Sequence, residues 1–204
     1  MERSVAISGR VVQILRVALV RLQQAFTSEM PAWAFFLDFV IYPPLILLCL
    51  YHALAGGGFV QATLALLAVL AGGALWSLAE YGIHRFAFHH APVLRPIHMA
   101  HHEAPRDLHG TPTLFTVIVF YLLVYLPLSG FLPHWGAVAG TAGVMLGYLA
   151  YVLVHYVVHH RGSGGVPALR RLIRLHAVHH HDTEHNFGVT TDLWDRVFGT
   201  LARR

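Results

Sequence analysis

The chain has 204 residues, of which 56% are hydrophobic and 12% charged, and its mean hydropathy is +0.56. This composition is too apolar for an ordinary soluble domain and predicts a single membrane-embedded domain. The net charge of +4 comes from arginines that flank hydrophobic segments, which indicates anchoring at an anionic membrane surface and argues against a nucleic-acid partner.

The N-terminal segment, residues 1–31, is expected to be an amphipathic helix in the membrane interface. Four arginines interrupt its apolar pattern, and it lacks the long uncharged stretch of a cleaved signal peptide. The remainder, residues 32–204, forms the predicted membrane-embedded domain.

Four stretches of this domain approach the length of about 20 mostly apolar residues that a bilayer crossing needs. They are residues 33–54, 59–78, 113–132 and 135–156. The first contains Asp38 and the pair Pro43-Pro44, so we expect a kink there, or a start that lies in the interface. The two short connections, 55–58 and 129–134, carry no arginine, so the positive-inside rule predicts that both termini are cytoplasmic.

Histidine is concentrated in two regions that follow the second and the fourth span. The chain has 17 histidines, and all but His52 and His134 lie in the predicted cytosolic regions 80–110 and 155–204. Because both regions emerge on the same side of the membrane, their side chains can form one shared site. His52 and His134 are expected to be ordinary interfacial residues.

The spacing of these histidines is that of metal ligands on helices. The motif HxxHH, at His98 and again at His176, places its three imidazoles within an arc of about 100° on one helix face. His155 and His159 are one turn apart, whereas His84 and His89 are about 140° apart on an α-helix, so that this pair needs two metals or a helix break. The ten candidate ligands exceed the capacity of one ion and predict two. They are His84, His89, His98, His101, His102, His155, His159, His176, His179 and His180.

A pH-sensing histidine cluster is the main alternative to a metal site, since imidazole titrates near neutrality. Such a cluster does not require the same helical geometry several times over. Five further histidines near the site fall outside the repeated spacing, and their roles are left open: His90, His109, His160, His181 and His185.

The combined pattern HRFAFH, HMAHH, HYVVH and HAVHH, followed by NFGVTTDLWDRVFGT, resembles the fatty acid hydroxylase superfamily. These integral-membrane proteins include sterol desaturases, C4-methyl sterol oxidases and fatty acid 2-hydroxylases, and the FGVTTDLWD stretch and HYVVHH favour the last branch. The resemblance covers about residues 78–201. It implies an all-α protein with four transmembrane helices and a cytosolic, histidine-rich helical cap that holds a dimetal centre.

Carried over by position, the ligands that the resemblance implies are the same ten histidines. One division gives the first metal His84, His98, His101, His176 and His179, and gives the other five to its neighbour. Glu80, Glu103 and Asp195, with Asp182 and Glu184, are candidates to orient these imidazoles through their second nitrogens. The alternative for each is a solvated or arginine-paired carboxylate.

The implied activity is dioxygen-dependent hydroxylation of a lipid acyl chain. Insertion of oxygen into a C–H bond needs a redox metal, so iron is the expected metal and zinc the alternative occupant of purified material. Nothing in the first 80 residues resembles a fused haem domain, so we expect a separate reductase as electron donor. The compact chain suggests a bacterial inner membrane.

Two other functions stay open at this point. A desaturase or methyl oxidase on the same scaffold would remove hydrogen or oxidise a methyl group. A non-enzymatic metal-binding or transport protein would need a polar path along its spans, and the last three spans contain almost no polar residues.

Overall fold

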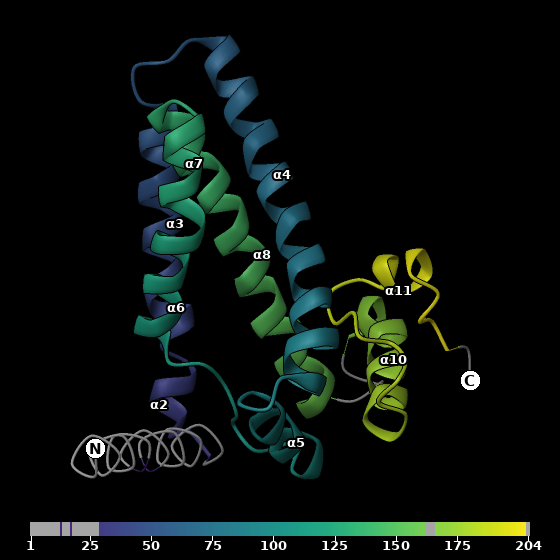
Figure 1. Cartoon of the computed structure of the whole chain (residues 1–204). Helices are drawn as coiled ribbons and strands as arrows, with labels where there is room; N and C mark the ends of the chain where they lie inside the picture. The colour runs from purple at the N-terminus through teal and green to yellow at the C-terminus, as the bar shows by residue number, and fades with distance from the viewer. Residues whose placement is uncertain (1–12, 14–16, 18–28, 162–165, 203–204) are drawn as a thin grey trace, which may run out of the picture.

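The computed structural model describes residues 13, 17, 29–161 and 166–202, in which the regular secondary structure is entirely helical, without a strand (Figure 1). The predicted interfacial helix at 1–31 lies largely outside the described residues and stays a prediction. The helices that form the membrane bundle are α2 (Ala32–Phe35), α3 (Asp38–Leu54), α4 (Phe59–Gly82), α6 (Thr113–Phe120), η2 (Tyr121–Tyr125), α7 (Leu126–Phe131) and α8 (His134–His160). The remaining elements are η1 (Ile83–Phe88), α5 (Arg95–Glu103), η3 (Pro167–Leu169), α10 (Arg170–His181) and α11 (Leu193–Val197).

Four helical stretches are long and apolar enough to cross a bilayer, which makes the chain a multi-pass integral membrane protein. They are Ala32–Leu54, Phe59–Phe88, Thr113–Phe131 and His134–His160. The second and fourth extend beyond the ranges expected from the sequence. Hydropathy detects only the apolar part of each helix. Both helices continue into a polar stretch that includes histidines among the candidate ligands.

The first span is interrupted earlier than its prolines suggest. The interruption lies at Phe36 and Leu37, between α2 and α3, and α3 then continues through Pro43 and Pro44. Asp38, at the start of α3, is buried and accepts a hydrogen bond of 2.7 Å from the hydroxyl of Tyr148 on α8. A polar partner of this kind explains how a carboxylate is accommodated in an apolar helix.

Helix α8 is the centre of the bundle: 56% of its most apolar window is buried, against 11–17% for the other spans. Small residues let α4 approach it closely. A Cβ atom added to Gly72 of α4 would lie 2.2 Å from the carbonyl oxygen of Gly140, and one added to Gly143 of α8 would lie 2.1 Å from that of Val69. The two helices are therefore held in one register by glycines that leave no room for a side chain.

The histidine-rich elements gather at one end of this bundle. Figure 1 shows α5, α10 and α11 beside the ends of α4 and α8, whereas the α3–α4 and α7–α8 connections lie at the opposite end. Residues from both halves of the chain thus meet at one end of the membrane spans.

Candidate metal centre

The first group of histidines, here called cluster A, combines residues from η1 and the position directly after it, from α5 and from α10. Each member places one ring nitrogen within 4.8 Å of the corresponding nitrogens of the others. Its members are His84, His89, His98, His102 and His179. All are buried or half-buried, and His179 has no exposed surface.

A π-helical turn brings His84 and His89 into the same cluster. Five residues apart, they would diverge on an α-helix, but residues 83–88 form the π-helix η1. Its i to i+5 hydrogen-bonding pattern brings residues five apart close to the same face. The pair therefore needs neither two metals nor an end to the helix, which are the alternatives that α-helical geometry allows.

The second group, cluster B, combines residues from α5, α8 and α10. His101, His155, His159 and His176 place one ring nitrogen each within 4.8 Å of one another. We include His180, because its Nε2 atom lies 3.2 Å from Nε2 of His176. The structure thus brings together all ten histidines that the spacing singled out.

The division between the clusters differs from the one drawn from the resemblance. His89 and His102 lie with His84 in cluster A, and His101 and His176 lie in cluster B. Each HxxHH motif supplies both clusters, since its arc of about 100° is wide enough to face two neighbouring points. The placement of each helix relative to its neighbours, and not the spacing of histidines in the sequence, decides which cluster each histidine joins.

The nitrogen atoms of the clusters face one another in a way that suits a cation. Nε2 of His98 lies 3.1 Å from that of His84 and 3.0 Å from those of His89 and His102. A ring nitrogen offers either one proton or one lone pair, so Nε2 of His98 cannot form hydrogen bonds with all three neighbours. Imidazole nitrogens that bind one ion at about 2.0–2.1 Å are themselves about 3 Å apart, so this spacing fits a shared metal ion.

Burial keeps the imidazoles in their neutral, metal-binding form. Desolvation, with a further contribution from neighbouring histidines, lowers the pKa of His101 and of His179 to about 2 and that of His89 to about 4. A neutral imidazole has a free lone pair, and metal binding does not have to displace a proton from these rings at neutral pH.

Two backbone carbonyls orient histidines of cluster A by hydrogen bonds to their Nδ1 atoms. Nδ1–H of His84 donates to the carbonyl oxygen of Phe187 at 2.5 Å, and Nδ1–H of His179 donates to that of His185 at 2.7 Å. Each bond fixes the tautomer that leaves Nε2 free to bind a metal. Sequence reasoning missed these partners, because every residue has a carbonyl and only the fold decides where it is directed.

The carboxylates expected to orient imidazoles contact the loop at residues 185–190 instead. Glu80 accepts hydrogen bonds from the backbone N–H groups of Val189 and Thr190, at 2.8 and 2.9 Å. Asp195 accepts them from Phe187 and Gly188, at 2.9 and 2.8 Å. Their effect on the histidines is therefore indirect.

The other three carboxylates lie at the surface or bind outside the clusters. Glu103 and Glu184 are exposed. Asp182 contacts Nδ1 of His185 at 3.0 Å, and His185 is not one of the ten candidate ligands.

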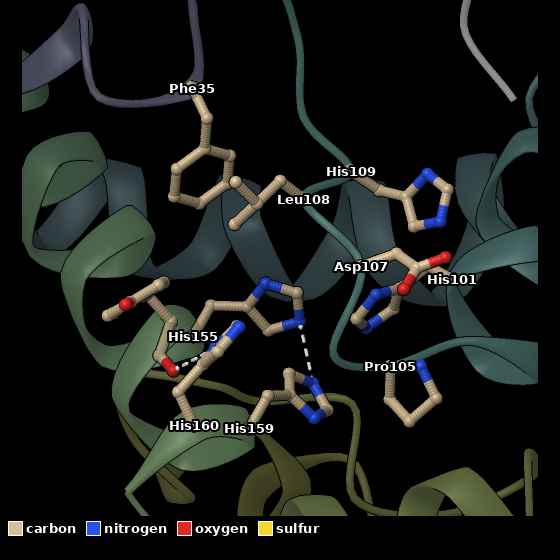
Figure 2. Close-up of a pocket in the computed structure, with 10 residues that line it drawn as sticks. Phe35, His101, Pro105, Asp107, Leu108, His109, His155, His159 and His160 are labelled. Carbon is tan, nitrogen blue, oxygen red and sulfur yellow. Dashed lines mark hydrogen bonds between the residues drawn. The ribbon is translucent and has the colours of Figure 1, made fainter. Parts of the chain in front are cut away.

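A pocket lies beside cluster B, and two of the five histidines that had no assigned role line it. Figure 2 shows His109 and His160 there, together with His101, His155 and His159 of the cluster. Nδ1 and Nε2 of His160 lie 2.9 and 3.0 Å from the carbonyl oxygens of Tyr156 and Arg106. Both ring nitrogens of His109 are buried and have no hydrogen-bond partner among the described residues. His90 and His181 are exposed.

The fold and the site together define a class: a multi-pass membrane protein with two adjacent histidine clusters at one end of its spans. Comparison with known proteins identifies the family. The family model described as fatty acid hydroxylase matches residues 69–200. The chain belongs to the fatty acid hydroxylase family.

Curated relatives are similar over the histidine-bearing part of the chain. The "Ceramide very long chain fatty acid hydroxylase SCS7" of Saccharomyces cerevisiae is 38% identical over 142 residues, covering 62% of this chain and 35% of that protein. The human "Fatty acid 2-hydroxylase" is 38% identical over 146 residues, covering 63% and 37%. This chain therefore spans little more than a third of these two relatives.

Two further comparisons cover a larger share of this chain and of the protein with which it is compared. The "Dihydroceramide fatty acyl 2-hydroxylase FAH1" of Arabidopsis thaliana is 31% identical over 185 residues, covering 79% of this chain and 71% of that protein. A solved structure titled "Full length scs7p (only hydroxylase domain visible)" aligns with a TM-score of 0.71 at 27% identity, covering 87% of this chain and 69% of that chain. The alignment supports the arrangement of spans and cap seen in Figure 1.

Proposed function

We propose that this protein hydroxylates the acyl chain of a membrane lipid, with two iron ions held by clusters A and B. The observation that carries the proposal is the convergence of ten imidazoles into two adjacent clusters, in a chain that belongs to this family. The names of the relatives, which include ceramide and dihydroceramide hydroxylases, support an acyl chain of a ceramide-type lipid as the substrate.

In this proposal the ten histidines bind the metals, and the loop at residues 185–190 orients two of them. The bound irons supply the redox chemistry that reduces dioxygen. One oxygen atom enters a C–H bond of the substrate, and the other leaves as water with two protons and two electrons. We propose that a separate reductase provides the electrons.

The apolar surface of the spans continues to the level of the clusters, which supports a substrate that stays in the membrane. Ile83 and Phe86, which flank His84 on η1, are 40% and 62% exposed. A lipid chain that reaches the site along such a surface avoids a transfer into water that costs about 0.8 kcal/mol per methylene. We further propose, on the basis of the arginine distribution, that the clusters and both termini face the cytoplasm. The membrane is proposed to be a bacterial inner membrane.

The function is tested by mass spectrometry of lipids from cells that express the protein with a reductase, iron and ¹⁸O₂. The control is His179→Ala, which removes a fully buried member of cluster A. A lipid that gains one ¹⁸O atom only with the unmodified protein would establish hydroxylation. Loss of two hydrogens from a lipid would indicate the desaturase alternative. An unchanged lipid profile, together with no oxygen consumption by the iron-loaded protein, would refute an oxygenase.

A further inference from the structure

The two carbonyls that orient cluster A belong to two peptide units, 185–186 and 187–188, whose N–H groups are each held by a hydrogen bond. The carbonyl of Phe187 shares its planar peptide unit with the N–H of Gly188, which donates to Asp195 Oδ2 at 2.8 Å. The N–H is trans to the carbonyl, so the bond to Asp195 directs the carbonyl oxygen toward His84 on the other side. The carboxylate thus sets the direction of a histidine partner that it does not touch.

The second peptide unit is held in the same way, through Thr200. The carbonyl of His185, which accepts from His179, shares its unit with the N–H of Asn186, and that group donates to the carbonyl oxygen of Thr200 at 2.9 Å. Thr200 is bound in turn to Asp195, by its hydroxyl to Oδ1 and by its N–H to the backbone carbonyl, both at 2.8 Å. Asp195 is therefore connected to both oriented imidazoles.

The chain between these two units has a conformation that its residues specify. Asn186 has a φ of 57°, in the left-handed region that asparagine tolerates better than most residues. Its buried amide donates to the carbonyl oxygen of Leu175 at 3.2 Å and accepts from the N–H of Ala202 at 2.9 Å. The loop is thus fixed from both ends, which is what a positioning element requires.

Cluster B lacks an equivalent arrangement among the described residues. Nδ1 of His176 and of His180 is buried and has no hydrogen-bond partner there. In cluster A, Nδ1 of His102 is likewise buried without a hydrogen-bond partner among the described residues. His84 and His179, however, each have a carbonyl partner. Partners of this kind fix the ring orientation before a metal arrives, and their removal typically lowers metal affinity about 10- to 100-fold.

We infer that cluster A binds its metal ion more tightly than cluster B, and that Asp195 is the positioning residue that produces this difference. The inference rests on the proposed dimetal centre and adds an order to it: cluster A fills first and empties last. It assigns to the NFGVTTDLWD segment a role in metal affinity without direct contact with the metal.

The order of affinities is tested with Co²⁺ as the probe, whose visible absorption reports its ligand geometry. The full chain in detergent is compared with two double variants, His84→Ala/His89→Ala, which leaves cluster B, and His155→Ala/His159→Ala, which leaves cluster A. Competition with graded chelator gives each affinity. We expect the cluster A protein to hold Co²⁺ about 10- to 100-fold more tightly, and equal or reversed affinities would overturn the inference.

The role of Asp195 is tested by adding Asp195→Asn to each double variant. Asparagine keeps the size of the side chain but replaces one acceptor oxygen with a donor. We expect Co²⁺ affinity to fall about tenfold or more in cluster A and to stay the same in cluster B. Equal losses in both clusters, or a protein that no longer folds, would show a general structural role and refute the positioning one.

Asp192→Asn is the matched control. Asp192 belongs to the same segment but pairs with Arg171 and Arg196 instead of the loop at 185–190, so the control should change neither affinity. The unmodified protein separates the two proposals at saturating Co²⁺. Fewer than two ions per chain would refute the dimetal centre itself, whereas two ions of equal affinity would refute only the order.

Discussion

His180 and His181 are sequence neighbours on α10 with opposite environments. His180 is half-buried, with its Nε2 atom 3.2 Å from that of His176, whereas His181 is exposed. Loss of a group that hydrogen-bonds to a ligand imidazole lowers metal affinity about tenfold or more. Removal of the ligand itself should lower it at least as much. We therefore expect His180→Ala to lower metal content and activity by about tenfold or more, and His181→Ala to change neither.

The expected difference between the two variants is tested by measuring metal content per chain and ¹⁸O incorporation into lipid. Because the two substitutions remove the same side chain from adjacent positions, effects on expression and helix propensity cancel. Equal losses in both variants would remove His180 from the ligand set.

Gly188 occupies a position in the loop at 185–190 that has no space for a side chain. An added Cβ atom would lie 2.1 Å from the carbonyl oxygen of Thr191 and 2.9 Å from Oδ2 of Asp195. We expect Gly188→Ala to destabilise the fold by about 1–3 kcal/mol, a typical cost of overpacking, and to lower metal content as the loop moves. Thermal unfolding in detergent measures the first effect and elemental analysis the second.

The control for Gly188→Ala is Gly130→Ala in α7, where an added Cβ meets nothing within 4 Å. Alanine in place of a helical glycine is neutral or slightly stabilising where space allows. An unchanged melting temperature for Gly188→Ala would contradict the packing of the loop described above.

At the scale of elements, the α4–α8 contact decides how the two clusters sit side by side. Helix α4 leads directly into η1, which carries His84 and is followed at once by His89, and α8 carries His155 and His159 at its end. Any separation of the two helices would therefore move one set of ligands relative to the other. Packing deep in the membrane is in this way coupled to the geometry of the metal centre.

Gly72 and Gly73 test this coupling from adjacent positions. The Cβ of Gly72→Ala would lie 2.2 Å from a backbone oxygen of α8, whereas that of Gly73→Ala meets its nearest atom at 3.8 Å, an ordinary contact. We expect Gly72→Ala to lower stability by about 1–3 kcal/mol and to reduce metal content, and Gly73→Ala to do neither. Thermal unfolding and metal analysis of both variants decide the matter, and equal behaviour would contradict the close contact.

At the scale of the whole molecule, the arginine distribution predicts the orientation in the membrane. Among the described residues, every arginine lies at the end of the bundle with α5 and α10, in residues 85–106 and 161–196, and the short connections at the other end bear none. The positive-inside rule then places the histidine clusters in the cytoplasm, on the side where cellular reductants are present.

Cysteine labelling in spheroplasts tests this orientation. With Cys49, the single native cysteine, replaced by alanine, Gly58→Cys lies in the α3–α4 connection and Glu103→Cys at the exposed end of α5. A membrane-impermeant maleimide should label Gly58→Cys in sealed spheroplasts and Glu103→Cys only after lysis. The reverse pattern would invert the proposed topology.

The sequence by itself determined which residues are the candidate ligands and that the chain spans a membrane. The ten candidate ligands follow from HxxHH at 98–102 and 176–180 and from the histidine pairs of the second and fourth spans, because helical periodicity places such spacings on one face. The four spans follow equally from length and hydropathy, since both are local properties of the chain.

Only the tertiary structure decided how the ligands divide between two clusters and what orients them. His101 lies between His98 and His102 of cluster A in its motif and still belongs to cluster B, because α5 contributes side chains to both clusters. The carbonyls of His185 and Phe187 reach His179 and His84 across 6 and 103 positions of sequence. No pattern of side chains encodes such contacts, since they depend on the directions of backbone groups that are fixed only when distant segments pack together.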